Sequence, residues 1–132
     1  MSSESNNKVI LSIDFGTKQW GLALRKPWSI PIPVGNIAND GDLWFSLMGL
    51  IAEHRVQIIL IGYPKNLVIR AHIDQAIKTL EMMDDTLEII RVDENYTSVQ
   101  AQAITGETGK HIAHDTLAAI EILNRYLQEK NS

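Results

Sequence analysis

The sequence predicts a layered fold of mixed α and β type, in a single domain that spans residues 1–132. The first third of the chain carries extended apolar segments, and the rest alternates helical with strand-like patterns. No Pro-, Gly- or Ser-rich linker divides the two parts. A chain of 132 residues fits one domain and is long enough to bury its own core.

Three extended segments come first. Residues 9–14 form a short apolar run, and residues 18–25 follow after a turn at Gly16, which predicts a hairpin. Residues 28–36 are the third segment. Their two prolines cannot donate a ladder hydrogen bond, so they favour a sheet edge or a strand terminus.

After the third strand, the apolar spacing becomes helical, and Asp40 or Asp42 is available as an N-cap. Helices then alternate with strands, so the strands that the helices connect are expected to be parallel. The predicted elements are a helix from Asp42, a strand over 56–62, a helix over 69–80, a strand over 87–92, a helix from Thr97 and a helix over 115–128.

Composition and charge narrow the possible functions. Sixteen acidic residues against twelve basic ones give a net charge of −4, which argues against a broadly basic surface but permits a local basic patch. The chain has no cysteine and therefore neither a disulfide nor a thiolate metal site. We find no signal peptide and no apolar run of membrane-spanning length, so we expect a cytoplasmic protein.

Three acidic residues stand where an α/β sheet builds its sites. Asp14 ends the first strand, and Glu94 lies two residues beyond the strand over 87–92, so parallel strands would bring both acids to one carboxyl edge. Asp115 opens the last helix, on the face that also carries Ala118 and Ala119. That face is expected to pack on the sheet.

Each acid also has a structural interpretation. Asp14 could cap its own turn, Glu94 could stabilise a helix N-terminus, and Asp115 could be an N-cap. Together, however, three carboxylates at one edge would repel one another unless cations neutralise them. A donor set of oxygens alone, without cysteine or a ligand-spaced histidine pair, suits Mg²⁺ or Mn²⁺.

Four stretches occur in the order, and at nearly the spacing, of the YqgF/RuvX family of Holliday-junction-resolvase-like nucleases. They are "IDFGTKQWGLAL", "IILIGYPKN", "RVDENYTSVQAQ" and "AHDTLAAIEILNRYL". The chain resembles this family over almost its whole length. The resemblance implies an RNase H-like fold and a nuclease acting on structured nucleic acid, notably in 5′-end maturation of pre-16S ribosomal RNA.

The resemblance also implies which residues act. The family's acid in a D-x-G-x-K segment corresponds to Asp14, the acid in its V-D-E-R segment to Glu94, and the acid in its D-x-x-A-A segment to Asp115. These three carboxylates would be the catalytic residues and the metal ligands. Two Mg²⁺ or Mn²⁺ ions about 4 Å apart would activate a water and stabilise the leaving oxygen.

The chain departs from the family pattern at two places. Asn95 stands where the family usually has an arginine, which removes a bidentate phosphate donor. The Gly- and Ser/Thr-bearing loop that commonly follows Pro64 is replaced by "KNLVIRAH", in which Lys65 and Arg70 could take over substrate contacts. The candidate substrate-binding residues are Lys18, Lys65, Asn95 and Lys110.

Other interpretations stay open. His111 and His114 could assist proton transfer beside Asp115 or form an exposed loop pair. Trp20 alternates with Leu22 and is expected in the core rather than on a base-stacking surface. The principal alternative function is a non-catalytic module that keeps the fold and binds RNA or protein. Metal binding that depends on Asp14 distinguishes the nuclease from that module.

Overall fold

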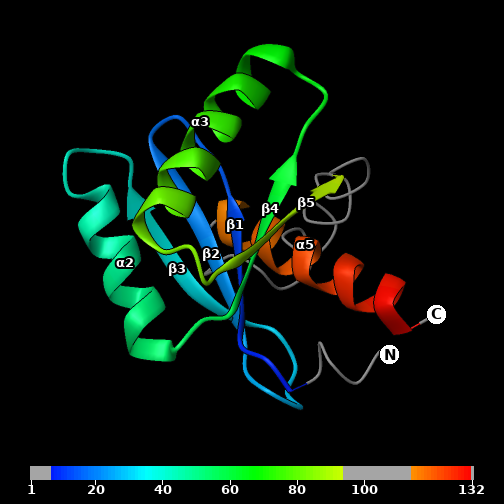
Figure 1. Cartoon of the computed structure of the whole chain (residues 1–132). Coiled ribbons are helices and arrows are strands. Elements are labelled where there is room, and N and C mark those ends of the chain that lie inside the picture. Colours follow the sequence, from blue (N-terminus) through cyan, green and yellow to red (C-terminus); the bar gives the residue numbers. More distant parts are fainter. Residues whose placement is uncertain (1–6, 94–113, 132) are drawn as a thin grey trace.

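The computed structural model describes residues 7–131, except for residues 94–113. Its elements are β1 (Ile10–Asp14), β2 (Gln19–Arg25), β3 (Ile32–Ala38), α2 (Leu43–His54), β4 (Ile58–Tyr63), α3 (Leu67–Met83), β5 (Glu88–Asp93) and α5 (His114–Asn131). This order confirms the predicted strands and three of the predicted helices (Figure 1). The helix predicted from Thr97 lies outside the described residues.

The strands form one five-stranded sheet in the order β3-β2-β1-β4-β5. β1 is antiparallel to β2, as the predicted hairpin requires, and it is parallel to β4. β4 is in turn parallel to β5. The carboxyl ends of β1, β4 and β5 therefore meet at one edge of the sheet.

The edge strand β3 begins later than predicted. Lys26 and Ser29 close a turn through a backbone hydrogen bond of 3.1 Å, and Trp28 within it has a φ of 61°, which no strand residue adopts. β3 then shifts its register on β2 between Leu22 and Ala23. At this bulge Gly35 has a φ of +123°, a conformation that side chains strongly disfavour.

The two helices that follow begin with different caps. Asp42 occupies the N-cap position of α2 without a capping side-chain hydrogen bond, and Asp40 instead accepts from the Asp42 backbone N–H. Helix α3 begins two residues earlier than predicted, because Asn66 accepts from the N–H groups of Val68 and Ile69.

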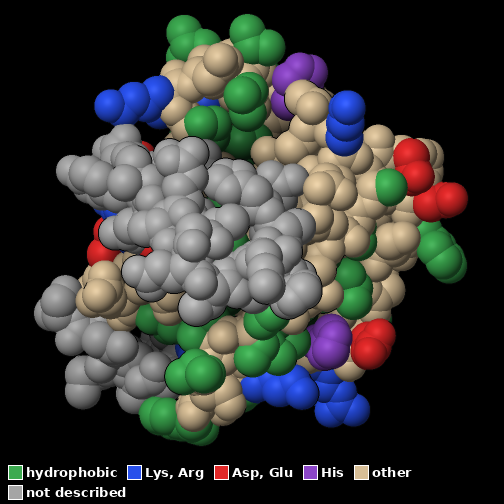
Figure 2. Space-filling view, turned by 180° about the vertical axis from the view of Figure 1, so that it is seen from behind, with side chains coloured by type: hydrophobic (Ala, Val, Ile, Leu, Met, Phe, Trp, Pro, Cys, Tyr) green, Lys and Arg blue, Asp and Glu red, His purple; other side chains and the backbone are tan. Residues whose placement is uncertain are grey.

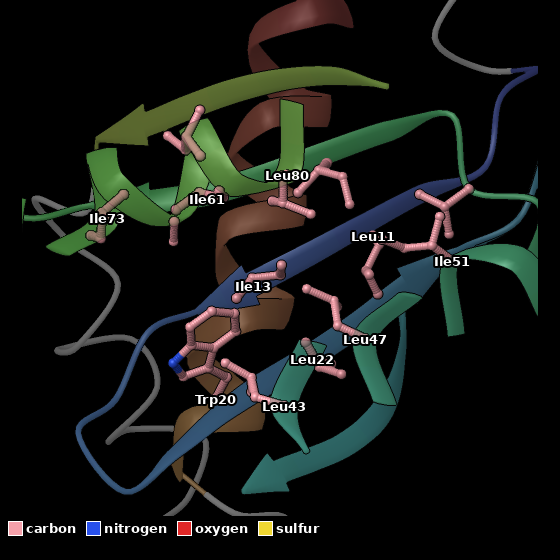
Figure 3. Close-up of a cluster of buried hydrophobic side chains, with 14 of the residues drawn as sticks. Leu11, Ile13, Trp20, Leu22, Leu43, Leu47, Ile51, Ile61, Ile73 and Leu80 are labelled. Atoms are coloured by element: carbon pink, nitrogen blue, oxygen red, sulfur yellow. The ribbon is translucent and has the colours of Figure 1, made fainter. Parts of the chain in front are cut away.

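Two apolar layers enclose the sheet. One face packs against α2 and α3, with Leu11 and Ile13 of β1 in that cluster (Figure 3). The other face packs against α5, with Ile10 of β1 beside Ala119 and Ile122. Trp20 is 4% exposed and lies in the first cluster, as expected for a core residue. Among the described helices, none combines the length and the apolar composition that a bilayer crossing needs.

Candidate active site at the carboxyl edge of the sheet

Asp14 is the last residue of β1 and is half-buried. Side chains alternate between the faces of a strand, so Asp14 shares the face of Ile10 and Ser12. That is the face covered by α5. The carboxylate predicted from the sequence therefore lies at the carboxyl edge, on the side of the last helix.

Two hydrogen bonds fix α5 on this face. The Ser12 hydroxyl donates to the backbone carbonyl of Ala119 at 2.7 Å in a buried contact. The Thr116 hydroxyl donates to the Asn36 side-chain oxygen at 2.6 Å. Asn36 pairs with Gly21, and Gly21 pairs with Asp14, so Asn36 stands in the same row of the sheet as Asp14.

These two hydrogen bonds fix the position of the first turn of α5 along the direction of the strands. Ala119 lies over Ser12, and one helical turn back towards the N-terminus, about 6 Å, reaches Asp115. Two strand residues forward from Ser12, about 7 Å, reach Asp14. The backbone of Asp115 therefore lies at about the same level along the sheet as Asp14. The helix face that carries Ala118 and Ala119 is buried, as predicted.

The other predicted site residues divide into two groups. Lys18 is exposed in the turn between β1 and β2, and Lys65 is exposed between β4 and α3. Glu94, which directly follows Asp93 at the end of β5, lies outside the described residues. So do Asn95, Lys110, His111 and the side chains of His114 and Asp115. Within the described residues no group of three or more His, Cys, Asp or Glu could hold a metal ion.

Sequence reasoning missed a polar network beside this edge. Arg91 donates to Asp74 through Nε and Nη2 at 3.2 and 3.0 Å, and the Tyr63 hydroxyl bonds the same carboxylate. The guanidinium groups of Arg70 and Arg91 lie 4.6 and 5.4 Å from the centroid of the Tyr63 ring. Arg70 belongs to the segment that departs from the family pattern, and it donates to the carbonyl of Pro64, which directly precedes that segment. The sequence offers one signal for this network: Tyr63 and Arg91 lie near the ends of two predicted strands.

The network gives a prediction for acid stability. The hydrogen bond from Arg91 lowers the pKa of Asp74 below its ordinary value, and Tyr63 adds to this effect. Because the pKa of Asp74 is lower in the folded state, its ionised carboxylate stabilises the fold fully at pH values above the ordinary pKa of an aspartate, about 3.9. This stabilisation is lost as the pH falls through the lowered pKa. We expect Asp74→Asn to flatten the dependence of the melting temperature on pH in that acidic range. Asp85→Asn removes an exposed acid and should leave the pH dependence of the melting temperature unchanged. If both variants flatten this dependence equally, the bond between Arg91 and Asp74 is not its source.

The charge on one face of the molecule agrees with the composition. On the face seen in Figure 2, the Lys and Arg side chains of the coloured part are scattered, with Asp and Glu side chains among them. No broad basic surface covers the described part of this face, as the net charge of −4 predicted. Contacts of a polyanion with the described part of this face would therefore be local.

Comparison with known proteins identifies relatives of the chain. The family model described as "RuvX: Holliday junction resolvase" matches residues 8–129. A protein of Dictyoglomus turgidum is 30% identical over 132 residues, covering 89% of this chain and 92% of its own. One from a Sulfurihydrogenibium species is 32% identical over 129 residues, covering 89% and 88%. Both are named "Putative pre-16S rRNA nuclease", and they support a nuclease role.

Two solved structures share the fold at low identity. The fowlpox virus Holliday junction resolvase matches with a TM-score of 0.62 at 10% identity, over 92% of this chain and 99% of its own. RuvC of T. thermophilus, solved with a Holliday junction substrate, matches with a TM-score of 0.65 at 11% identity, over 95% and 98%. The fold is RNase H-like, as the sequence resemblance implied.

Proposed function

Because the chain belongs to the RuvX family, we propose that it is a metal-dependent nuclease that hydrolyses phosphodiester bonds in structured nucleic acid. The observation that carries this proposal is the position of Asp14, at the carboxyl edge of the sheet and in one row with the first turn of α5. An acid on a strand is held more precisely than an acid on a loop, and a metal ligand needs such precision. The relatives' name makes precursor 16S ribosomal RNA the first substrate to test.

The donor chemistry fits Mg²⁺ or Mn²⁺. Asp14, Glu94 and Asp115 would offer carboxylate oxygens, which hard divalent cations prefer. Bound there, such ions would supply water activation and neutralise the charge that develops on the leaving oxygen. The chain's own part is to hold the acids: β1 fixes Asp14, and the bonds from Ser12 and Thr116 fix the helix that carries Asp115.

Basic side chains would position the substrate. Lys18 follows Asp14 by four residues and is exposed in the turn after β1, and Lys65 is exposed beyond β4 at the same edge of the sheet. Each could bind a backbone phosphate and hold the scissile bond over the carboxylates. Lys110 is proposed for the same role from the sequence alone.

The function is tested by incubating the chain with labelled substrates in Mn²⁺ or in EDTA. The panel holds an RNA with an unprocessed 5′ extension, a DNA four-way junction and single strands of each sequence. We expect cleavage of a structured substrate in Mn²⁺ and none in EDTA. Binding without cleavage in both conditions would instead establish the non-catalytic module.

Asn95 allows a test of the substrate surface. Asn95→Arg should restore a bidentate phosphate contact and tighten binding. One more neutralised phosphate should also steepen the logarithmic dependence of affinity on salt by roughly 0.7–0.9. Affinity for one structured RNA at two salt concentrations measures both effects. Asn124→Arg adds the same charge at an exposed position of α5 and serves as the control. If the unaltered chain and both variants show the same salt dependence of affinity, Asn95 does not contact the substrate.

A further inference from the structure

A pocket of about 480 Å³ lies between α2, α3 and the turn that connects β1 to β2. Its volume falls within the range of about 300–1,000 Å³ that is typical of small-ligand sites. Three aromatic residues line it: Phe15, Trp20 and Trp44. The ring centroids of Phe15 and Trp20 are 4.0 Å apart, and Trp44 meets Trp20 edge to face at 5.8 Å. The rings therefore brace one another, and the partly exposed rings of Phe15 and Trp44 offer a surface on which a flat aromatic guest can stack.

The indole N–H of Trp20 is a buried donor in this wall. The side chain is 4% exposed, and within the described part of the chain Nε1 has no hydrogen-bond acceptor. Figure 3 shows the ring nitrogen on the side of the indole turned away from Leu22 and Leu43. Buried donors are normally satisfied, and this one has almost no exposed surface, so the polar groups that a guest can reach in the pocket are those on the α3 side.

The α3 side of the pocket supplies further polar groups. His72 and Gln75 are exposed side chains that line it, together with Thr79. None of the lining residues is a Lys, Arg, Asp or Glu among those that the structure describes. A phosphate would find no cationic partner here, whereas a neutral heterocycle with donors and acceptors at its edge would find several.

The pocket adjoins the candidate active site. Phe15, Gly16 and Thr17 line it, and they directly follow Asp14 in the chain. Asp14 faces α5, and the pocket opens on the other face of the sheet, so the β1–β2 turn separates the two. A nucleic-acid strand that crosses the turn with a phosphate at Asp14 could insert a neighbouring base on the far side.

We propose that this pocket binds an unpaired base of the nucleic-acid substrate, next to the phosphodiester bond that is cut. This proposal rests on the proposed nuclease function for the identity of the strand. The guest is a planar heteroaromatic base, stacked on the partly exposed rings of Phe15 and Trp44 and hydrogen-bonded along its edge. Recognition of an unpaired base would select junctions or loops over continuous duplex.

The test compares two RNA duplexes that differ by one unpaired adenine, with binding measured by fluorescence anisotropy in EDTA so that no cleavage occurs. We expect the chain to bind the duplex with the unpaired base about tenfold more tightly, as stacking of one base in an aromatic site permits. Trp44→Ala should reduce the ratio of the two affinities to about one. His72→Ala, a change at an exposed side chain that leaves the core intact, should reduce it as well.

The matched control is Phe45→Ala. Phe45 follows Trp44 on the same helix, is 85% exposed and does not line the pocket, so this variant should keep the full ratio. A ratio of one in the unaltered chain, or equal losses in the Trp44 and Phe45 variants, would overturn the proposal. So would free adenosine that competes as strongly as the duplex with the unpaired base, because the pocket would then be a nucleoside site.

The outcome is separable from that of the nuclease test. Metal-dependent cleavage with an affinity ratio of one refutes the pocket and leaves the nuclease function standing. A tenfold ratio without cleavage in Mn²⁺ refutes the nuclease function and retains the pocket as the base-binding site of an RNA-binding module.

Discussion

Asp14→Asn is expected to abolish phosphodiester cleavage while the protein stays folded. The substitution keeps the size of the side chain at the end of β1 but removes a charged metal ligand. Metal catalysis supplies several kcal/mol to such reactions, and each factor of ten corresponds to about 1.4 kcal/mol, so the cleavage rate should fall roughly 10²- to 10⁴-fold. Initial cleavage rates in Mn²⁺, with circular dichroism to verify the fold, measure this effect.

Asp85→Asn is the matched control for Asp14→Asn. Asp85 is exposed and precedes β5, so it lies towards the opposite edge of the sheet from Asp14. The same loss of one negative charge there should leave the cleavage rate unchanged. A folded Asp14→Asn variant that cleaves at the rate of the control would show that Asp14 is a turn residue and that the catalytic carboxylates lie elsewhere.

Ile122→Ala is expected to produce a large loss of stability. The side chain is fully buried between the helix and the sheet, so its truncation should lower the free energy of unfolding by about 2–5 kcal/mol. Domains of this kind are stable by only about 5–15 kcal/mol, so the loss is a large fraction of the total. Chemical denaturation monitored by circular dichroism measures it. Cleavage should fall too, because α5 carries Asp115.

Leu67→Ala controls for the shortening of an aliphatic side chain. Leu67 is 76% exposed at the start of α3, so its truncation should change the free energy of unfolding by no more than about 0.5 kcal/mol. If Ile122→Ala were equally mild, α5 would not be held on the sheet by this apolar layer.

The layered fold was predictable from the sequence because its signals are local. Apolar periodicity located each described strand and helix, and prolines marked β3 as an edge strand. Errors occurred at the boundaries: the turn around Trp28 delayed β3, and the capping side chain of Asn66 started α3 early. Such details depend on single backbone angles and hydrogen bonds, to which periodicity is insensitive.

The candidate site was only partly predictable. The parallel order of the strands allowed Asp14 to be assigned to the carboxyl edge, and the buried Ala118 and Ala119 agree with the predicted face of the last helix. The bond between Thr116 and Asn36 joins residues 80 positions apart, and no sequence pattern indicates it. The expectation that Trp20 is a core residue was confirmed, but the pocket beside it depends on how α2 and α3 approach each other. The roles of Glu94, Asn95 and Lys110 stay predictions.

We propose that Asp14 helps to hold a catalytic divalent metal, and thermal unfolding with increasing Mn²⁺ distinguishes this role from a purely structural one. Ligand at 100 times its dissociation constant stabilises a folded protein by about 2.7 kcal/mol, which corresponds to a rise of several degrees in melting temperature. We predict this rise for the unaltered chain and for Asp85→Asn, and its loss in Asp14→Asn. No rise in the unaltered chain, or the same rise in Asp14→Asn, would show that Asp14 does not hold the metal.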